Sequence, residues 1–392
     1  MGEQVVHPVG RRRALIGAAL LDLAVSPLFA WGVFTGPLRR ELGADDAWLA
    51  GVFSVGLVAF MLGVLLGGRA ADLISPRRLA AVTALGAVAG LAGSAAAGSV
   101  GLMMLTFGGL LGGSTGVGYA TAVRVAATVG SRRGLALGLV VGAYAVGTAV
   151  LAPISAALLA AYGRGPTFLL LAVAVGAVLS LAAALVPGGP GRRKGREPRT
   201  SPAGRAHVPS RPVVALWLVF LLGSAAALAA FAHAGQLSGS AAVAVAVALL
   251  NLGNLAGRLL AGPVSDRLGR SATLHGQCAL LVLACVPLAL GAAGPWALVA
   301  LSLLGVQYGA LSTLTPAAVS DVVPAERFGA TYGLVFTGWG LAGLVAPVAA
   351  AALATGIGFD GVYRGFLVIG ALTWICVIAF TRARPGPPTP ES

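Results

Sequence analysis

Long apolar runs alternate with short polar intervals along the whole chain, and they fall into two sets of six. The first set covers 14–38, 47–68, 79–97, 101–129, 135–160 and 166–186, and the second covers 213–235, 241–262, 272–291, 296–322, 328–354 and 362–381. Each run is long enough to span a bilayer, which takes about 20 residues. Because open sheet edges cannot satisfy their backbone hydrogen bonds in lipid, the runs are predicted to be helices. The pattern predicts an all-α integral membrane fold with twelve transmembrane helices.

The polar interval between the two sets, residues 187–212, is rich in Gly, Pro and Arg and almost free of apolar residues. Such a segment cannot build a core, so it is predicted to be a flexible cytoplasmic linker. It divides the chain into an N-terminal six-helix half (1–186) and a C-terminal six-helix half (213–384). The Pro-rich tail, 385–392, is expected to be disordered.

Composition and charge agree with a membrane protein. Mean hydropathy is +0.92 and only 10% of residues are charged, against about a quarter in soluble domains. The net charge of +14 raises nucleic-acid binding as an alternative. However, most of the 26 Lys and Arg residues fall in alternate loops, as the positive-inside rule requires. The distribution favours lipid headgroups over nucleic acid and predicts a bacterial inner (plasma) membrane protein with both termini in the cytoplasm.

An internal repeat relates the two halves. The stretch GGRAADLISPRR, residues 67–78, has a second copy in GPVSDRLGR, residues 262–270. The spacing from Asp72 to Asp266 equals the spacing from Pro153 to Pro347. Two parallel six-helix repeats around a central axis form a transporter architecture.

The repeated motif, with the helix count, resembles the major facilitator superfamily. A narrower resemblance is to its oxalate/formate exchangers and monocarboxylate transporters. The phrases that carry it are FAWGVFTGPLRRELG, GVGYATAV, SRRGLALGLVVGAYAVG, NLGNLAGRLLAGPVSDRLGR and TYGLVFTGWGLAGLVAP. This resemblance implies transport of a small organic anion by alternating access, often proton-linked, and it does not identify the substrate.

The motif is expected to form a gate. A carboxylate beside a helix junction can cap the positive N-terminus of a helix in the opposite half; the candidate helices begin near Gly329 for Asp72 and near Gly134 for Asp266. The first copy has Leu73 where the family has a cation, so it is predicted to be the weaker contact. The predicted gating residues are Asp72, Arg77, Asp266, Arg267 and Arg270.

Arg258 lies inside the eighth apolar run, where a charge costs several kcal/mol unless it faces a cavity or a partner. A guanidinium presents a planar fork that matches a carboxylate. By resemblance, Arg258 matches an arginine that binds the substrate's carboxylate. Asn254 stands where monocarboxylate transporters have an acidic residue, and Trp339 where oxalate exchangers have a lysine. The alternatives are that Arg258 reaches the headgroups or pairs structurally, and that Trp339 only packs.

Asp22 and Arg124 are two further charges at membrane depth. Counted from the basic clusters, both lie at a similar depth, which predicts a pair between the first and fourth helices. Such a pair is a candidate for proton coupling; a static ion pair is the alternative. Tyr119 and Tyr144 follow the phrases quoted above and, with Arg258, Asn254 and Trp339, are predicted to contact substrate.

Other functional classes lack their signatures. The sequence has no phosphate-binding Gly-Lys-Ser/Thr loop, no HExxH and no GxSxG motif. Its three cysteines lie inside apolar runs without metal-ligand spacing. We therefore expect a monomeric secondary transporter without cofactor or metal, and not an enzyme. The rival hypotheses are a proton-driven exporter of drugs or secondary metabolites, and a membrane receptor or scaffold that does not transport.

Overall fold

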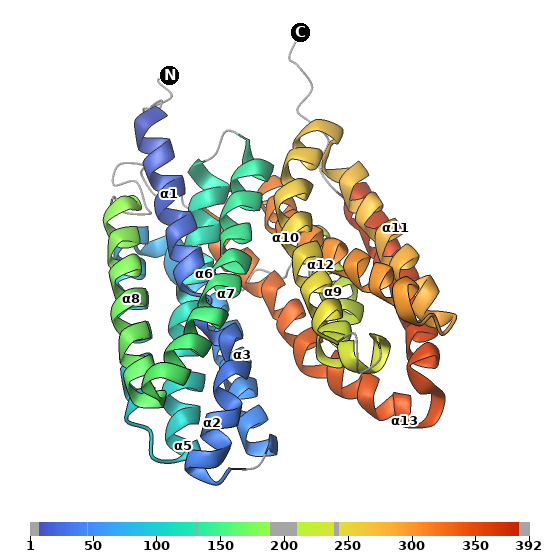
Figure 1. Cartoon of the computed structure of the whole chain (residues 1–392). Coiled ribbons are helices and arrows are strands. Elements are labelled where there is room, and N and C mark those ends of the chain that lie inside the picture. The colour runs from blue at the N-terminus through green and yellow to red at the C-terminus, as the bar shows by residue number, and fades with distance from the viewer. Residues whose placement is uncertain (1–7, 45, 130–131, 189–209, 239–242, 384–392) are drawn as a thin grey trace, which may run out of the picture.

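The computed structural model describes residues 8–44, 46–129, 132–188, 210–238 and 243–383, and these residues are helical almost throughout (Figure 1). The predicted all-α membrane fold is confirmed. The helices are α1 (Pro8–Ala24), α2 (Gly32–Leu42), α3 (Asp46–Leu73), α4 (Pro76–Ala95), α5 (Val100–Met103), α6 (Gly112–Val129), α7 (Arg133–Tyr162), α8 (Arg164–Leu185), α9 (Arg211–Ser238), α10 (Val243–Leu268), α11 (Arg270–Ala289), α12 (Gly294–Val322) and α13 (Phe328–Ala383).

Ten helices of the described chain are long and apolar enough to cross a membrane, and two features bring the number of crossings to twelve. The 56-residue α13 is divided by Gly358, whose backbone (φ 69°, ψ 167°) ends one crossing and starts the next. The first crossing combines α1, the short 3₁₀ helix η1 (Pro27–Ala30) and α2. All twelve predicted crossings are therefore present.

The first crossing is not the continuous helix that its apolar run predicted. Pro27 opens η1 and has no backbone N–H to donate into the preceding turn. The chain consequently leaves the helix after Ala24 and resumes it at Gly32. The fourth crossing is also irregular, since a π-helical turn (η2, Met104–Leu111) joins α5 to α6.

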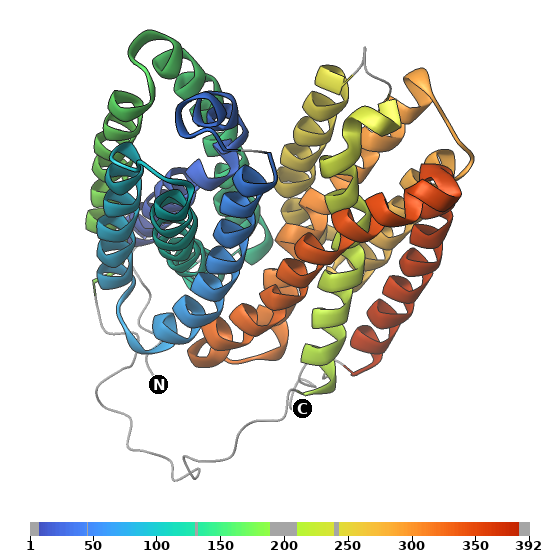
Figure 2. The same cartoon turned by 90° about the horizontal axis from the view of Figure 1, so that it is seen from below.

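The crossings form two bundles, α1–α8 and α9–α13, and the beginning of α1 and the end of α13 lie at one end of the pair (Figures 1 and 2). We call this the basic end, because Arg77, Arg78 and Arg267 lie at its helix termini. The predicted linker lies largely outside the described residues, and the predicted disordered tail lies wholly outside them.

The two bundles approach each other most closely at the basic end. A Cβ atom on Gly68 of α3 would collide with the carbonyl oxygen of Gly329 in α13. A Cβ on Gly262 of α10 would collide with the carbonyl of Gly134 in α7. Glycine at these positions lets the helix backbones touch, and the contacts join residues from opposite halves.

Candidate functional site

Aromatic rings from both halves pack together between the bundles. Phe60 of α3 lies 6.0 Å from Phe336 and 6.2 Å from Trp339 of α13, measured between ring centroids. On the N-terminal side, the rings of Tyr119 and Tyr144 meet edge to face at 5.8 Å. We call this group the aromatic cluster; its members are Phe60, Tyr119, Tyr144, Tyr332, Phe336 and Trp339.

Hydrogen bonds tie the cluster together. The hydroxyl groups of Tyr119 and Tyr332, from opposite halves, lie 3.2 Å apart. Trp339 donates its indole N–H to the hydroxyl of Tyr308 at 2.7 Å. The structure thus brings together the three ring residues predicted to contact substrate: Tyr119, Tyr144 and Trp339.

Sequence reasoning missed the other members of the cluster, although a signal was present. Tyr332 and Phe336 precede Trp339 at spacings of seven and three residues, which places all three on one helix face. Phe60 carried no comparable signal, because it is one apolar residue among many in α3.

Arg258 of α10 is 7% exposed, and its guanidinium bonds within the protein. Its Nε donates to the side-chain oxygen of Asn254 at 3.0 Å, and its Nη1 donates to the carbonyl of Val141 in α7 at 2.7 Å. Among the described residues, no carboxylate lies within ion-pair distance of the guanidinium. The site therefore holds a buried cation that bonds to neutral oxygens in both halves.

Asp22 of α1 is completely buried, and neither carboxylate oxygen has a hydrogen-bond partner within the described chain. The predicted pair with Arg124 is absent. Arg124 instead donates its Nε to Asp72 at 3.0 Å, because its long side chain reaches Asp72 at the end of α3. Arg258 is the cation whose charge acts on Asp22. The charge of Asp22 in turn acts on the hydroxyls of Tyr119 and Tyr144.

The helix caps predicted at the two copies of the motif are both present. Asp72 accepts backbone N–H groups of Gly329 at 3.0 Å and Ala330 at 2.8 Å. Asp266 accepts those of Gly134 at 3.1 Å and Leu135 at 3.0 Å. Each carboxylate thus binds the N-terminus of a helix in the opposite half.

The basic residues of the motif take no part in the two helix caps within the described residues. Arg77 donates to the carbonyl of Ala184 at 3.3 Å, within its own half. Arg270 pairs with Asp321 at 3.1 Å, also within one half. Arg267 is exposed. None of the three binds the opposite half in the described part of the chain.

The first copy of the motif makes more contacts than the second copy. Asp72 has an ion pair with Arg124 in addition to its two backbone bonds. Among the described residues, Asp266 has only its two backbone bonds. The cation that the sequence lacks after Asp72 is supplied by α6, so the prediction of a weaker first copy was wrong about the contacts.

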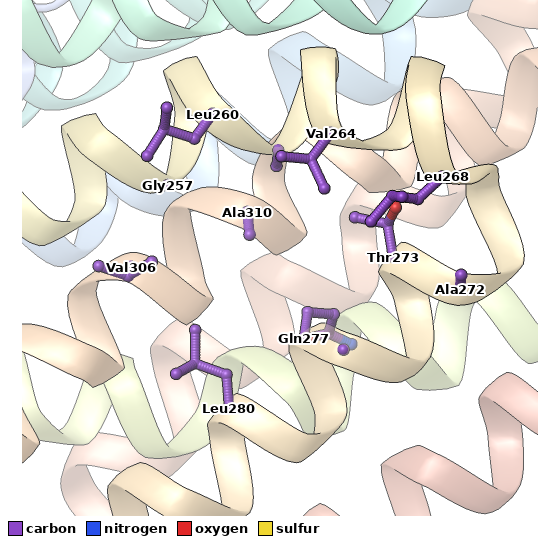
Figure 3. A pocket seen from close by; sticks show the side chains of 12 residues that line it. Gly257, Leu260, Val264, Leu268, Ala272, Thr273, Gln277, Leu280, Val306 and Ala310 are labelled. Atoms are coloured by element: carbon purple, nitrogen blue, oxygen red, sulfur yellow. The ribbon is translucent and has the colours of Figure 1, made fainter.

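A separate groove lies on the outer face of the C-terminal half, between α10, α11 and α12 (Figure 3). Apolar side chains such as Leu260, Val264 and Leu268 line it, and its lining includes no charged residue. None of the predicted substrate residues borders it. In the described chain, no group of three metal-ligating side chains gathers anywhere.

Two six-helix halves that meet around buried charged and aromatic groups have the architecture of a secondary transporter, and not of an enzyme. The chain belongs to the Major Facilitator Superfamily, whose family model matches residues 14–315 and 236–392. It is 25% identical over 342 residues to the uncharacterized MFS-type transporter YhjX of Escherichia coli (strain K12), covering 83% of this chain and 84% of that protein.

Solved structures agree in fold. The human organic anion transporter MFSD10 (TETRAN) matches with a TM-score of 0.74 at 17% identity, covering 94% of this chain and 99% of that one. The transporter FucP, in the outward conformation, matches with a TM-score of 0.74 at 13% identity, covering 96% and 99%. At these identities the likeness shows the fold alone.

Proposed function

We propose that this transporter carries a small organic anion, such as a monocarboxylate, across a bacterial plasma membrane by alternating access. The observation that carries the proposal is Arg258, a buried cation that bonds to neutral oxygens and, among the described residues, pairs with no carboxylate. A charge held at membrane depth costs several kcal/mol, and the carboxylate of a bound substrate would offset that cost with charge-assisted bonds.

The surroundings of Arg258 favour a compact substrate with one negative charge. Asn254 and Val141 already occupy two of its donor groups, and Trp339 stands where oxalate exchangers have a second cation. Aromatic rings such as those of Tyr119 and Trp339 favour a substrate that is apolar in the part of the molecule beyond its carboxylate. A dicarboxylate would leave one charge without a partner.

Anion binding would also act on the contact between the halves. The Val141 carbonyl that accepts from Arg258 belongs to α7, whereas Arg258 belongs to α10. A substrate carboxylate that takes this donor group would remove a bond between the bundles. Substrate binding and opening of the basic end are therefore coupled in this proposal.

Asp22 is our candidate for the proton-coupling residue, acting with Arg258 in place of Arg124. The carboxyl group is buried without a hydrogen bond, and Arg258 is the cation that acts on it. When a substrate anion neutralises Arg258, the ionised form of Asp22 loses its compensating charge, and a proton takes that place. One anion and one proton would then cross together.

The caps at Asp72 and Asp266 are our candidates for the gate. The positive-inside rule favours a cytoplasmic basic end. Contacts between the halves at that end would keep the cytoplasmic side closed while the opposite side admits substrate. The gate would open when both helix N-termini leave their carboxylates.

A proton-driven exporter of drugs or secondary metabolites is the second candidate, and the six rings of the aromatic cluster favour it. The test is uptake into proteoliposomes, measured with a matched panel of labelled monocarboxylates, dicarboxylates and cationic amphipathic drugs. Saturable transport of monocarboxylates alone supports our proposal, and transport of the drugs alone contradicts it. Binding without counterflow of any compound would indicate a receptor or scaffold.

A further inference from the structure

A cavity of about 510 Å³ opens at the basic end between α7 and α10, beside the Asp266 cap. Arg132 and Leu135 line it from the N-terminal half, and Pro263, Asp266 and Arg267 from the C-terminal half. Within the described chain, neither guanidinium makes a hydrogen bond or an ion pair. The oxygens of Asp266, the one acidic residue of the lining, already accept two backbone N–H groups.

The repeat supplies an internal comparison. At the α3–α13 contact, Leu73 occupies the position that corresponds to Arg267, directly after the aspartate. Arg327 occupies the position that corresponds to Arg132, two residues before the first capped N–H. Leu73 is 69% exposed. The α3–α13 contact therefore lacks an arginine after its aspartate and still forms the same cap, with Arg124 paired to Asp72, so the cap does not require an arginine at the position of Arg267.

The apolar groove of Figure 3 lies next to this cavity on the same helix. Arg267 is adjacent to Leu268 in the sequence. Since successive residues of a helix are about 100° apart around its axis, Arg267 lies about 60° around α10 from Val264. Leu260 and Leu268 are 61% and 68% exposed, so the groove opens outward from the bundle, where lipid surrounds a membrane protein. Arg267 thus lies at the edge of α10 between the cavity and the groove, although the two share no lining residue.

We propose that this junction binds an anionic phospholipid, with its phosphate between Arg132 and Arg267 and one acyl chain in the groove. Paired guanidinium groups suit a phosphate, and the groove selects a lipid over a soluble phosphate. Because the two arginines belong to opposite halves, the bound lipid also holds the basic end closed. The inference does not depend on which substrate the protein carries.

The test is lipid titration of the purified protein followed by native mass spectrometry. Phosphatidylglycerol and phosphatidylcholine with the same acyl chains are compared, since only the first carries a net negative charge. Each surface cation contributes about 1 kcal/mol to binding an anionic lipid. The double variant Arg132→Gln/Arg267→Gln is therefore expected to bind phosphatidylglycerol about thirtyfold more weakly, whereas the double Lys variant stays close to wild type.

A second variant tests the groove without touching the arginines. Gly276 lines the groove and has open space around its Cα, so Gly276→Leu fills the groove without a collision. It is expected to weaken phosphatidylglycerol binding. Gly365→Leu in α13, another position with open space, and Arg78→Gln on α4 are the matched controls.

Three results would overturn the proposal. The first is equal binding of the two lipids by the wild type. The second is a double Gln variant that binds like Arg78→Gln. The third is that inorganic phosphate competes with phosphatidylglycerol while Gly276→Leu leaves the lipid binding unchanged. That result would assign the cavity to a soluble anion.

Discussion

Replacing Asp72 by Asn should open the basic end far more than replacing Asp266 by Asn. Asp72 is partly buried, and its charged oxygens bind two backbone N–H groups of α13. The amide of Asn keeps one acceptor and turns a donor toward the other N–H. Losing one bond to a charged group costs about 1.5–3 kcal/mol, which shifts the ratio of open to closed basic ends by about 10- to 150-fold.

Asp266 is exposed, so water competes for its helix cap. Loss of an N-cap costs about 0.5–2 kcal/mol, which gives a shift of about 2- to 30-fold for Asp266→Asn. The two variants should differ in stability as well. Only Asp72→Asn leaves Arg124 buried without its carboxylate, so only that variant should lower the thermal midpoint clearly.

The populations are measured by pulsed electron paramagnetic resonance between spin labels at Arg78 and Arg382, exposed positions at the basic ends of the two halves. Cys376 is replaced by Ala to prevent extra labelling. Asp360→Asn serves as control, because that residue pairs with Arg364 within α13. A larger shift for Asp266→Asn, or no shift for either variant, would refute the assignment of the caps as the gate.

Three further substitutions have expected outcomes. Asp22→Asn should abolish uptake driven by a pH gradient but spare anion exchange, and undiminished pH-driven uptake would remove Asp22 from coupling. Gly68→Val should clash with the Gly329 carbonyl and, at about 1–3 kcal/mol for overpacking, open the basic end about 5- to 150-fold in the same spin-label assay; an unchanged distance would count against the packing. Tyr119→Phe should lose one neutral hydrogen bond between the halves, worth about 0.5–1.5 kcal/mol. It should therefore open the basic end less than Asp72→Asn does, and a larger opening would contradict this order of the two contacts.

The fold and the capping contacts could be predicted from the sequence for the same reason. Apolar runs and loop charges determine the crossings, and a duplicated motif specifies which ends of the two halves meet. Given that symmetry, the carboxylates at Asp72 and Asp266 have few helix N-termini within reach. The beginnings of α13 and α7 were therefore predictable partners.

Side-chain reach and breaks in helices could not be predicted in this way. Counting residues placed Asp22 and Arg124 at the same depth in the membrane. The guanidinium of Arg124, however, extends several ångströms from the backbone and pairs with Asp72 instead. An apolar run also conceals a break such as the one at Pro27, since lipid-facing composition continues across it. The contact of Arg258 with Val141 depends on how α7 lies against α10, which no local pattern encodes.

The most direct test of the account is monocarboxylate counterflow in proteoliposomes, comparing wild type with Arg258→Gln. Gln places its amide where the arginine Nε lies and can still donate to Asn254, but it lacks the charge that binds the substrate; Arg364→Gln, at an exposed position, is the matched control. We expect Arg258→Gln to raise the half-saturating anion concentration about 10- to 150-fold, since one bond to a charged group contributes about 1.5–3 kcal/mol. Counterflow equal to that of the wild type would contradict the assignment of Arg258 as the anion site.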